Sequence, residues 1–380
     1  MSAARLGAHV LPTYPRLDVT FVEGDGVWLT DDGGRRYLDF LAGIAVVGLG
    51  HCHPGVAAAA HAQLDRLWHV SNLFWTQPMA ELADRLSGRF GGAQAFFCNS
   101  GAEAIEAGLK YARKKSGKPG IVALEQSFHG RTLGALSVTG QPAKWQGFGP
   151  LLPDVRFARL NDAESLAAAA ADGNVGCVLL EPIQGEGGIN PATRQFLDSV
   201  TELARAEGAV VFFDEIQCGL GRTGTFFAHE QLGVKPDVVA LAKGLANGLP
   251  IGCLLVADEA AGGFVPGDHA STFGGNPVTC AAGCAVVDAI DDALLANVRA
   301  MGERLRDGLA SLPGVEETRG TGLLLGCDLD RPAGPVMGAC LEAGLIVGTA
   351  GEKVLRLTPP LVIETEHVDR ALAILAKVLA

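Results

Sequence analysis

The sequence lacks the features that mark several large classes of protein. No basic cluster is longer than the Arg-Lys-Lys run at 113–115, and the formal net charge is −12 with a pI of about 5.2. Binding to a nucleic-acid backbone needs a positive stripe, so nucleic acid is not an expected partner. No apolar run is long enough to span a bilayer, and the N-terminus lacks the pattern of a signal peptide. We therefore expect a protein that binds neither nucleic acid nor membranes.

Patterns for metal, disulfide and P-loop sites are also missing. The nine cysteines are odd in number and scattered, without a C-x-x-C, and the closest pair is Cys280 and Cys284. This spacing suits neither a disulfide framework nor a zinc site. We expect no metal site, and mostly buried thiols in a reducing cytoplasm. The absence of G-x-x-x-x-G-K-[ST] excludes a P-loop.

What the sequence does contain is a large apolar fraction arranged in short runs. Hydrophobic residues make up 48% of the 380 residues, and the mean hydropathy is +0.25. The first forty residues read as extended, with a hairpin over 26–40. From residue 57 helical patterns alternate with apolar runs, which lie at 94–98, 120–124, 176–182, 209–215 and 237–243. Continuous apolar strands separated by helices predict a mostly parallel sheet covered on both faces.

The pattern changes after about residue 258. A helical stretch over 277–312 is followed by short strand-like runs and a final helix, which predicts a smaller α+β domain. The predicted fold class is α/β, a mostly parallel sheet domain with a smaller α+β C-terminal domain. The predicted boundaries are an N-terminal extended segment at 1–50, a large ligand-binding α/β domain at 51–257 and the small domain at 258–380.

Polar residues follow three of the predicted strands, where parallel sheets gather their ligands. Ser100 and Gly101 come between a strand and a helix, which is either an ordinary N-cap or an anion site. Asp214 ends an apolar strand, where a carboxylate needs a partner: a structural arginine or the protonated ring nitrogen of a heterocycle. Lys243 ends the next run, either as a lysine that reaches solvent or as a desolvated amine able to form a Schiff base.

Together these three features are far more specific than any one alone. A phosphate cradle, a carboxylate for a pyridinium nitrogen and an amine for an aldehyde are what pyridoxal 5'-phosphate (PLP) requires. The sequence therefore predicts a PLP-dependent enzyme.

The same segments carry a resemblance to a known family. Six motifs are similar to the successive signatures of the class III aminotransferases, in the family's order: SGAEAIEA, FHGRT, EPIQGEGG, DEIQCGLGRTG, ALAKGLANGLPIG and STFGGNP. The similarity runs from about Tyr14 to Ile363. It implies fold type I of the PLP-dependent transferases.

The resemblance also assigns roles to residues. Lys243 would form the Schiff base and shuttle the proton, and Asp214 would bind the pyridine nitrogen. The other implied cofactor contacts are Ser100, Gly101 and Ala102 at the phosphate, Phe128 on the ring face, Gln217 at the ring 3'-oxygen, and Thr272 at the phosphate of the other subunit. Such sharing implies an active homodimer. Ala102 departs from the threonine of many relatives, so one phosphate hydroxyl is missing.

The implied substrate contacts are fewer. Arg131 would clamp a carboxylate, Arg356 would take the second carboxylate of 2-oxoglutarate, and Glu186 would pair with Arg356 when the donor has no carboxylate there. Ser271 would lie beside the substrate. Outside the motifs, the two arginines would read as ordinary salt-bridge partners, and Phe128, Gln217 and Thr272 as packing or capping residues. Glu181 reads equally well as a structural carboxylate.

Ile44 bears on the choice of amino donor. It stands where ornithine aminotransferases, in our alignment, carry a tyrosine that can bind a free α-amine, whereas isoleucine tolerates an acylated nitrogen. The expected reaction moves the δ-amino group of N2-acetyl-L-ornithine to 2-oxoglutarate, in arginine biosynthesis. The alternatives left open are succinylornithine, succinyldiaminopimelate, a carrier-bound lysine precursor, ornithine or 4-aminobutyrate as donor, a PLP mutase, or a non-catalytic protein.

Overall fold

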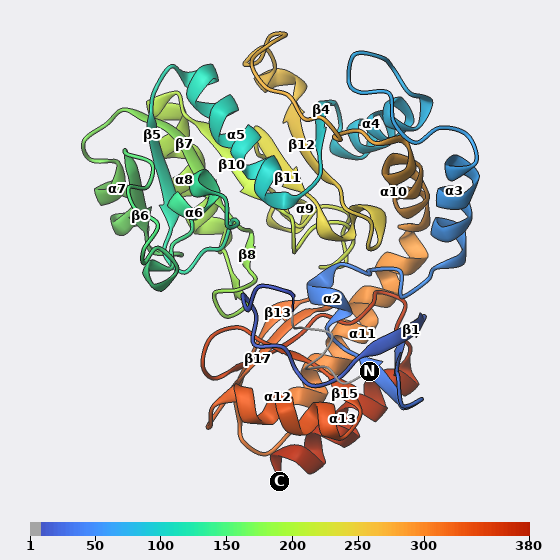
Figure 1. The fold of residues 1–380 in the computed structure, drawn as a ribbon. Coiled ribbons are helices and arrows are strands. Elements are labelled where there is room, and N and C mark those ends of the chain that lie inside the picture. Colours follow the sequence, from blue (N-terminus) through green and yellow to red (C-terminus); the bar gives the residue numbers. More distant parts are fainter. Residues whose placement is uncertain (1–8) are drawn as a thin grey trace.

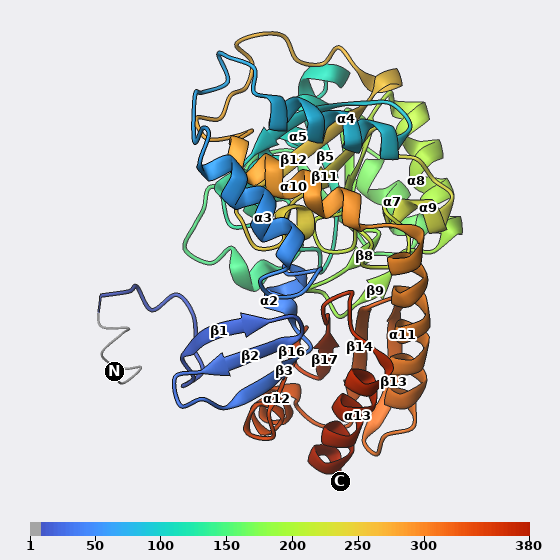
Figure 2. The same cartoon turned by 90° about the vertical axis from the view of Figure 1, so that its right-hand side faces the viewer.

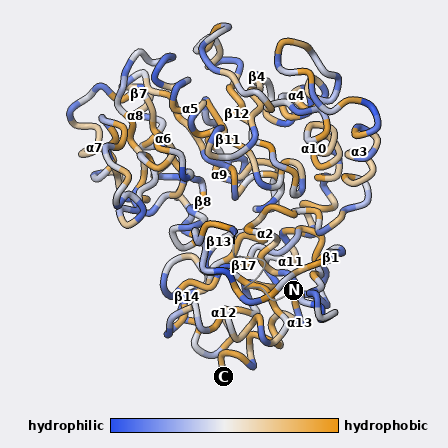
Figure 3. The backbone as a smooth tube through the Cα atoms, in the orientation of Figure 1, coloured by the Kyte–Doolittle hydropathy of each residue, from blue (hydrophilic) through white to orange (hydrophobic). Residues whose placement is uncertain are grey.

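The computed structural model describes residues 9–380, so the first eight residues of the predicted segment 1–50 lie outside the described residues. The chain forms one large sheet flanked by helices and a smaller part below it, in which both ends of the described chain lie (Figure 1). Hydrophobic residues concentrate along the inner strands and the helix faces that cover them (Figure 3). Among the described residues, the structure contains no helix that is both long and apolar enough to cross a membrane.

The large sheet has seven strands. In spatial order they are β4 (Ala93–Cys98), β12 (Gly252–Ala257), β11 (Val238–Leu241), β10 (Val210–Asp214), β7 (Val175–Leu180), β5 (Gly120–Leu124) and β6 (Val155–Ala158). Strand β12 runs antiparallel to both neighbours, and the other pairings are parallel. The five predicted strands and the mostly parallel sheet are therefore confirmed. Strands β6 and β12 were not predicted.

Helices cover both faces of this sheet (Figure 2), and every residue of its five inner strands is buried. The helices around it are α3 (Pro54–Leu64), α4 (Gln77–Phe90), α5 (Gly101–Ser116), α6 (Leu133–Ser137), α7 (Ala163–Ala170), α8 (Arg194–Glu207), α9 (His229–Leu232) and α10 (Pro277–Ala289). Short 3-10 turns and a small ribbon complete it: η1 (Pro142–Lys144), η2 (Lys243–Ala246), η3 (Asp258–Ala260), β8 (Ile183–Gln184) and β9 (Asn190–Pro191). Continuous apolar strands thus form the core of a two-sided layer.

The smaller part holds two four-stranded sheets. One joins β1 (Phe21–Asp25), β2 (Trp28–Asp31), β3 (Arg36–Asp39) and β15 (Leu345–Ile346); the other joins β13 (Val315–Thr321), β14 (Leu324–Leu329), β17 (Val354–Leu357) and β16 (Gly348–Thr349). Helices α11 (Asp292–Ala310), α12 (Ala333–Glu342) and α13 (Thr365–Leu379) pack on them. The hairpin predicted over 26–40 is confirmed as β2 and β3.

The N-terminal strands belong to the core of this smaller part. Strand β3 pairs in parallel with β15, and Val27, Leu38 and Phe40 pack in one cluster with residues of the C-terminal helices. The domain boundaries at 50 and 257 stay predictions, but this pairing places β1 to β3 with the C-terminal elements.

The single helical stretch predicted over 277–312 is wrong in one respect. It is divided into α10 and α11, because Ile290 leaves the helical region of backbone space with φ −83° and ψ 78°. Asp291 then caps the second helix by accepting a hydrogen bond from the Leu294 N–H. Helix α11 thereby leads the chain from the large sheet into the smaller part.

Candidate active site

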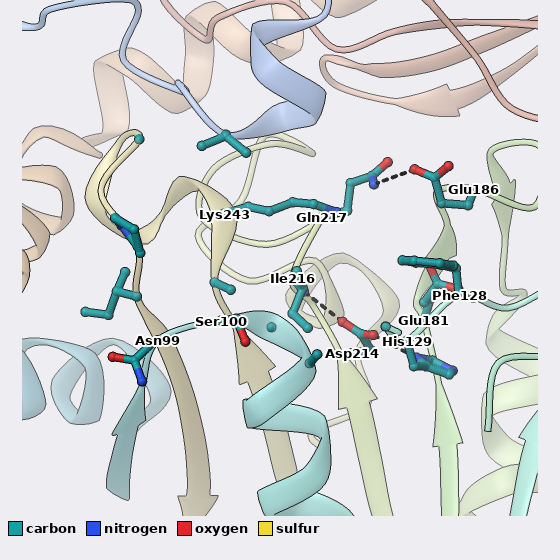
Figure 4. A pocket seen from close by; sticks show the side chains of 18 of the residues that line it. Asn99, Ser100, Phe128, His129, Glu181, Glu186, Asp214, Ile216, Gln217 and Lys243 are labelled. Atoms are coloured by element: carbon teal, nitrogen blue, oxygen red, sulfur yellow. Dashed lines mark hydrogen bonds and ion pairs between the residues drawn. The ribbon is translucent and has the colours of Figure 1, made fainter. Parts of the chain in front are cut away.

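A cavity of about 320 Å³ opens at the carboxyl ends of the parallel strands (Figure 4). This is the edge where open α/β sheets bind ligands, and the volume is within the usual range for small-molecule sites. The lining residues come from the N-terminal segment at residue 46, from the ends of β4, β7, β10 and β11, from the loops after β5 and β8, and from the loop before β12. They are Val46, Asn99, Ser100, Gly101, Ala102, Phe128, His129, Gly130, Glu181, Glu186, Asp214, Ile216, Gln217, Ala242, Lys243, Gly248, Leu249, Pro250 and Ile251.

The N-terminus of helix α5 forms one wall. Ser100 is the N-cap, and its hydroxyl accepts a hydrogen bond from the Glu103 N–H. The next two residues, Gly101 and Ala102, have N–H groups without an acceptor inside the helix, because they belong to its first turn. A Cβ at position 101 would lie 2.8 Å from Cδ1 of Ile216, so the glycine allows this side chain to pack closely against the helix N-terminus. The wall thus offers backbone donors to an anion.

Asp214 occupies the end of β10 and is 4% exposed. Its Oδ2 lies 2.7 Å from Nδ1 of His129, and its Oδ1 accepts a hydrogen bond from the Ile216 N–H at 3.0 Å. The suggestion of a structural arginine partner is therefore wrong: the side-chain partner is a histidine. Each carboxylate oxygen has two acceptor sites, so Asp214 keeps capacity for a further donor from the cavity.

Lys243 begins the turn η2 directly after β11, with the unusual backbone angle φ 41°. Burial lowers the pKa of its amine, and the nearby carboxylates Glu186 and Asp214 partly oppose this effect. A lysine amine with a lowered pKa is more available as a nucleophile or base than an exposed one. Figure 4 shows its side chain extending along the cavity, between the residues of β10 and Gln217.

Glu181 is a buried carboxyl beneath the cavity. Its two oxygens accept hydrogen bonds from the Phe128 and Gly185 N–H groups, each at 3.0 Å. Burial raises its pKa to about 7, and the negative charge of Asp214 adds to this rise, although His129 opposes it. The structural interpretation of Glu181 is supported by these backbone bonds, since they fix the loops on either side of the strand end.

Glu186 and Arg356 form an ion pair at the side of the cavity nearest the smaller part. Burial opposes ionisation of Glu186, but Arg356 outweighs it and lowers the pKa of this carboxyl. Gln217 bridges them, donating to Glu186 at 3.5 Å and accepting from Arg356 at 3.4 Å. Nε of Arg356 is buried and has no hydrogen-bond partner among the described residues. The pair predicted by resemblance is thus in contact.

Phe128 and Arg131 follow β5. Phe128 lines the cavity, and Arg131 is exposed, with its guanidinium carbon 5.5 Å from the Phe128 ring centroid. A cation over an aromatic face is a favourable contact. Arg131 does not line the cavity itself, so its clamp role stays a prediction.

Three further predicted residues lie outside the lining. Ser271 accepts a hydrogen bond from the side chain of Asn99 at 3.2 Å, which connects it to the cavity wall. Thr272 is exposed and points to no group of this chain that the structure records. Ile44 lies in α2 (Ala42–Ala45), 40% exposed, two residues before the lining residue Val46.

Sequence reasoning missed His129, Asn99 and Val46. His129 was the nearest to being found, because it stands inside FHGRT between two residues that were assigned roles. Its contact with Asp214 joins positions 85 residues apart, which no local pattern reveals. Its Nε2 is buried without a partner among the described residues.

These groups fit PLP. A row of backbone donors at a helix N-terminus suits its phosphate, a buried carboxylate suits its ring nitrogen, and an amine with a lowered pKa suits its aldehyde. All three line one cavity of adequate volume. The fold and the site therefore define a PLP-dependent transferase of fold type I.

Comparison with known proteins gives the family. The family Aminotransferase class-III matches residues 12–379. Acetylornithine aminotransferase 1 of Bordetella bronchiseptica is 48% identical over 373 residues, covering 95% of each chain. The chain belongs to the class-III aminotransferases and is PLP-dependent.

Solved structures agree with this assignment. The N-acetylornithine aminotransferase of Stenotrophomonas maltophilia K279a matches with a TM-score of 0.86 and 37% identity, over 99% of this chain and 98% of that one. An ornithine aminotransferase of Toxoplasma gondii matches with a TM-score of 0.94 and 31% identity, over 99% and 92%. That structure is described as having partial occupancy of PLP at its active site.

Proposed function

We propose that this enzyme transfers the δ-amino group of N2-acetyl-L-ornithine to 2-oxoglutarate. The products are N-acetyl-L-glutamate 5-semialdehyde and L-glutamate, in a step of arginine biosynthesis. The observation that carries the proposal is the ion pair between the buried Arg356 and Glu186, which lines the cavity. Relatives named as acetylornithine aminotransferases, at 44% to 48% identity, support the choice of donor.

The pair explains how one pocket accepts two different substrates. An ω-amino donor has no carboxylate beside its reacting carbon, so Arg356 needs Glu186 to neutralise it during that half of the reaction. 2-Oxoglutarate brings a carboxylate to the same place, where it replaces Glu186 as the partner of Arg356 in a bidentate contact. Arg356 is buried, and leaving its charge without a partner would cost on the order of 3–5 kcal/mol. The pocket is therefore neutral at this point with either substrate.

The strand-end residues would hold the cofactor and move the proton. Ser100, Gly101 and Ala102 would bind the phosphate, Asp214 the ring nitrogen and Gln217 the ring oxygen, with Phe128 against the ring. When bound, PLP supplies an electron sink for the negative charge that develops on the donor carbon. The Nζ atom of Lys243 would take the proton from that carbon, and in the second half of the reaction it would give a proton to the corresponding carbon of the keto acid.

His129 keeps Asp214 oriented toward the cavity through its Nδ1 contact. Water is excluded from this contact, because Asp214 and His129 are 4% and 2% exposed. Arg131 would take the carboxylate at the far end of either substrate, after a rotation from its contact with Phe128. Ser271 and Ile44 would border the same end.

The active form is proposed to be a homodimer. Leu73, Phe74 and Trp75 form an exposed apolar segment, at 85%, 65% and 88% exposure, on the same side of the chain as the exposed Thr272. A second copy would cover this segment and bring its own Thr272 to the phosphate of the first. Sedimentation showing only monomers in a fully active sample would overturn this part. A cytoplasmic location is consistent with nine free cysteines, of which all but Cys52 are buried.

A product assay tests the donor and the acceptor together. The purified enzyme with PLP is given 2-oxoglutarate and one of four donors: N2-acetyl-L-ornithine, N2-succinyl-L-ornithine, L-ornithine or 4-aminobutyrate. We expect L-glutamate to form with the highest kcat/KM from the acetylated donor, and the matching semialdehyde to appear by mass spectrometry. A higher kcat/KM with L-ornithine or 4-aminobutyrate would replace the proposed donor.

A further inference from the structure

The short helix α2 is left-handed. Ala42, Gly43, Ile44 and Ala45 have φ values of 51°, 63°, 67° and 61°, so four successive residues lie in the left-handed region. The Ala45 N–H bonds to the Leu41 carbonyl at 3.0 Å, which closes one left-handed helical turn. L-residues other than glycine rarely adopt this conformation, and for a β-branched residue such as Ile44 it is an outlier. We call residues 42–45 the left-handed turn.

Packing does not compensate for the strain at Ile44, the β-branched residue of the left-handed turn. Ile44 is 40% exposed, whereas Ala42 and Ala45 are buried. Backbone strain of this kind persists only where the surrounding structure fixes it, and such positions cluster at ligand sites. The segment lies between the large sheet and the strands of the smaller part (Figures 1 and 2).

A buried carboxylate fixes the start of the turn. Oδ1 of Asp39 accepts hydrogen bonds from the Leu41 and Ala42 N–H groups, both at 2.8 Å. Its Oδ2 lies 2.7 Å from Nε2 of His51, and Asp39 is 1% exposed. The carboxylate thus holds the two N–H groups through which the chain enters the left-handed region.

Both flanks of the turn are tied to the active site. Asn247, four residues after Lys243, accepts from the Leu49 N–H at 2.8 Å and donates to the Gly50 carbonyl at 2.9 Å. Thr358, two residues after Arg356, donates through its hydroxyl to the Leu41 carbonyl at 2.8 Å. Hydrogen bonds therefore connect the segment of the turn to the loop that follows Lys243 and to the chain that follows Arg356. Val46, directly after the turn, lines the cavity.

We propose that Asp39, supported by His51, is a positioning residue that holds the left-handed turn and thereby sets which amino donor the pocket accepts. The proposal rests on the proposed function, because the turn places Ile44 two residues before the lining residue Val46, at the end of the cavity proposed for the α-nitrogen of the donor. Release of the turn displaces Val46 from the cavity wall and Ile44 from its border, and leaves Lys243, Asp214 and the phosphate cradle in place. Donor selection is then lost before the chemistry is lost.

Hydrogen–deuterium exchange of the protein without donor tests the structural half. In Asp39→Ala we expect the peptide covering 40–50 to exchange at least about tenfold faster, with the strands of the large sheet unchanged. Asp291→Ala, which removes an N-cap aspartate from α11, is the matched control and leaves this peptide unchanged. Thr358→Val, a nearly isosteric change that removes only the hydroxyl bond, gives a smaller acceleration in the same peptide and serves if Asp39→Ala does not fold.

Donor kinetics test the functional half. In Asp39→Ala, and to a lesser degree in Thr358→Val, we expect the ratio of kcat/KM for N2-acetyl-L-ornithine over L-ornithine to fall about tenfold, mainly through the KM of the acetylated donor. Asp39→Asn restores most of the ratio, because its amide oxygen still accepts from both N–H groups. Asp291→Ala leaves it unchanged.

The possible failures are distinguishable. Unchanged exchange of 40–50 in both variants shows that Asp39 and Thr358 do not hold the turn. Faster exchange with an unchanged donor ratio shows that the turn does not select the donor; either result overturns the proposal. If the wild-type enzyme does not accept the acetylated donor, the proposed function fails. The ratio of kcat/KM is then taken between L-ornithine and 4-aminobutyrate, and the proposal is again overturned by unchanged exchange of 40–50 or by an unchanged ratio.

Discussion

The two halves of the active site are built in different ways. Lys243, Asp214 and the phosphate cradle follow directly from strand ends of one buried sheet, where the backbone leaves few choices. Ile44 and Arg356 instead arrive from the N-terminal segment and from the smaller part, and meet the sheet through a left-handed turn and an ion pair. The difference indicates that chemistry depends on the rigid half and choice of substrate on the assembled half.

The largest effect is expected in the strand-end half. Lys243→Ala removes the proposed proton carrier, and kcat should fall by about 10²- to 10⁴-fold with every donor, because positioned acid–base groups contribute on this scale. Steady-state turnover with 2-oxoglutarate measures the loss. Lys235→Ala, at an exposed lysine, is the control and keeps wild-type kcat. A Lys243→Ala enzyme with kcat within tenfold of wild type would remove the lysine from the mechanism.

The assembled half should respond with substrate-specific effects. Arg356→Gln removes the charge proposed to bind the keto acid, and the KM for 2-oxoglutarate should rise about 10- to 100-fold, since hydrogen bonds to charged groups contribute roughly 1.5–3 kcal/mol. The KM of the amino donor should change much less, because Glu186 occupies Arg356 in that half of the reaction. Arg304→Gln, at a surface ion pair with Asp369, is the control. Equal rises in the KM values of the amino donor and 2-oxoglutarate would contradict the proposal that Arg356 binds the keto acid alone.

The rigid half also carries a pH dependence of stability. The pKa of Glu181 is raised to about 7 by burial, so the folded protein binds a proton more tightly than the unfolded chain. Protonation of Glu181 therefore stabilises the folded protein. This stabilisation is fully present below pH 4.5 and is lost as the pH rises through about 7; it amounts to at most about 3 kcal/mol in the free energy of unfolding. Urea unfolding between pH 5 and 8 should show this decline in wild type and a smaller one in Glu181→Gln.

Glu207 is a carboxyl whose pKa is shifted in the opposite direction to that of Glu181. The Lys118 side chain lowers the pKa of Glu207, so its contribution is lost only at acid pH, below the window measured. Glu207→Gln should therefore leave the slope between pH 5 and 8 as it is in wild type. Identical slopes in wild type and Glu181→Gln would show that this carboxyl is ionised throughout.

The smallest expected effect concerns the strain in the assembled half. Asparagine adopts the left-handed region more readily than a β-branched residue, so Ile44→Asn should raise the free energy of unfolding by about 1 kcal/mol. Val265→Asn changes a similarly exposed β-branched residue whose φ is not positive, and should give no gain. Thermal and urea unfolding measure both variants. A loss of stability in Ile44→Asn would mean that the turn is not strained.

This contrast also explains what the sequence could reveal. The apolar runs predicted five strands of a mostly parallel sheet, and the residues at their ends suggested the cofactor groups, because each signal is local. Strand β12 was missed because its run, Gly252 to Ala257, follows a glycine- and proline-containing loop and was not separated from the lysine segment. The contact of His129 with Asp214 was missed because it depends on tertiary packing.

The assembled half was predictable only through resemblance to the family. Nothing local in the sequence marks 42–45 as left-handed, since Gly43 is the one glycine among them. The pairing of β3 with β15 joins Leu38 to Leu345, and the ion pair joins Glu186 to Arg356, across separations that no periodicity reports. The resemblance named Glu186 and Arg356 as partners, but the pairing of β3 with β15 was not predicted and became visible only in the fold.

The donor half-reaction tests the central claim most directly, because it isolates the amino donor from the keto acid. The PLP-loaded enzyme is mixed rapidly with N2-acetyl-L-ornithine or L-ornithine alone, and the change in the visible absorbance of the cofactor is followed. We predict that the acetylated donor changes the spectrum at least about tenfold faster at equal concentration. A faster change with L-ornithine would contradict the account.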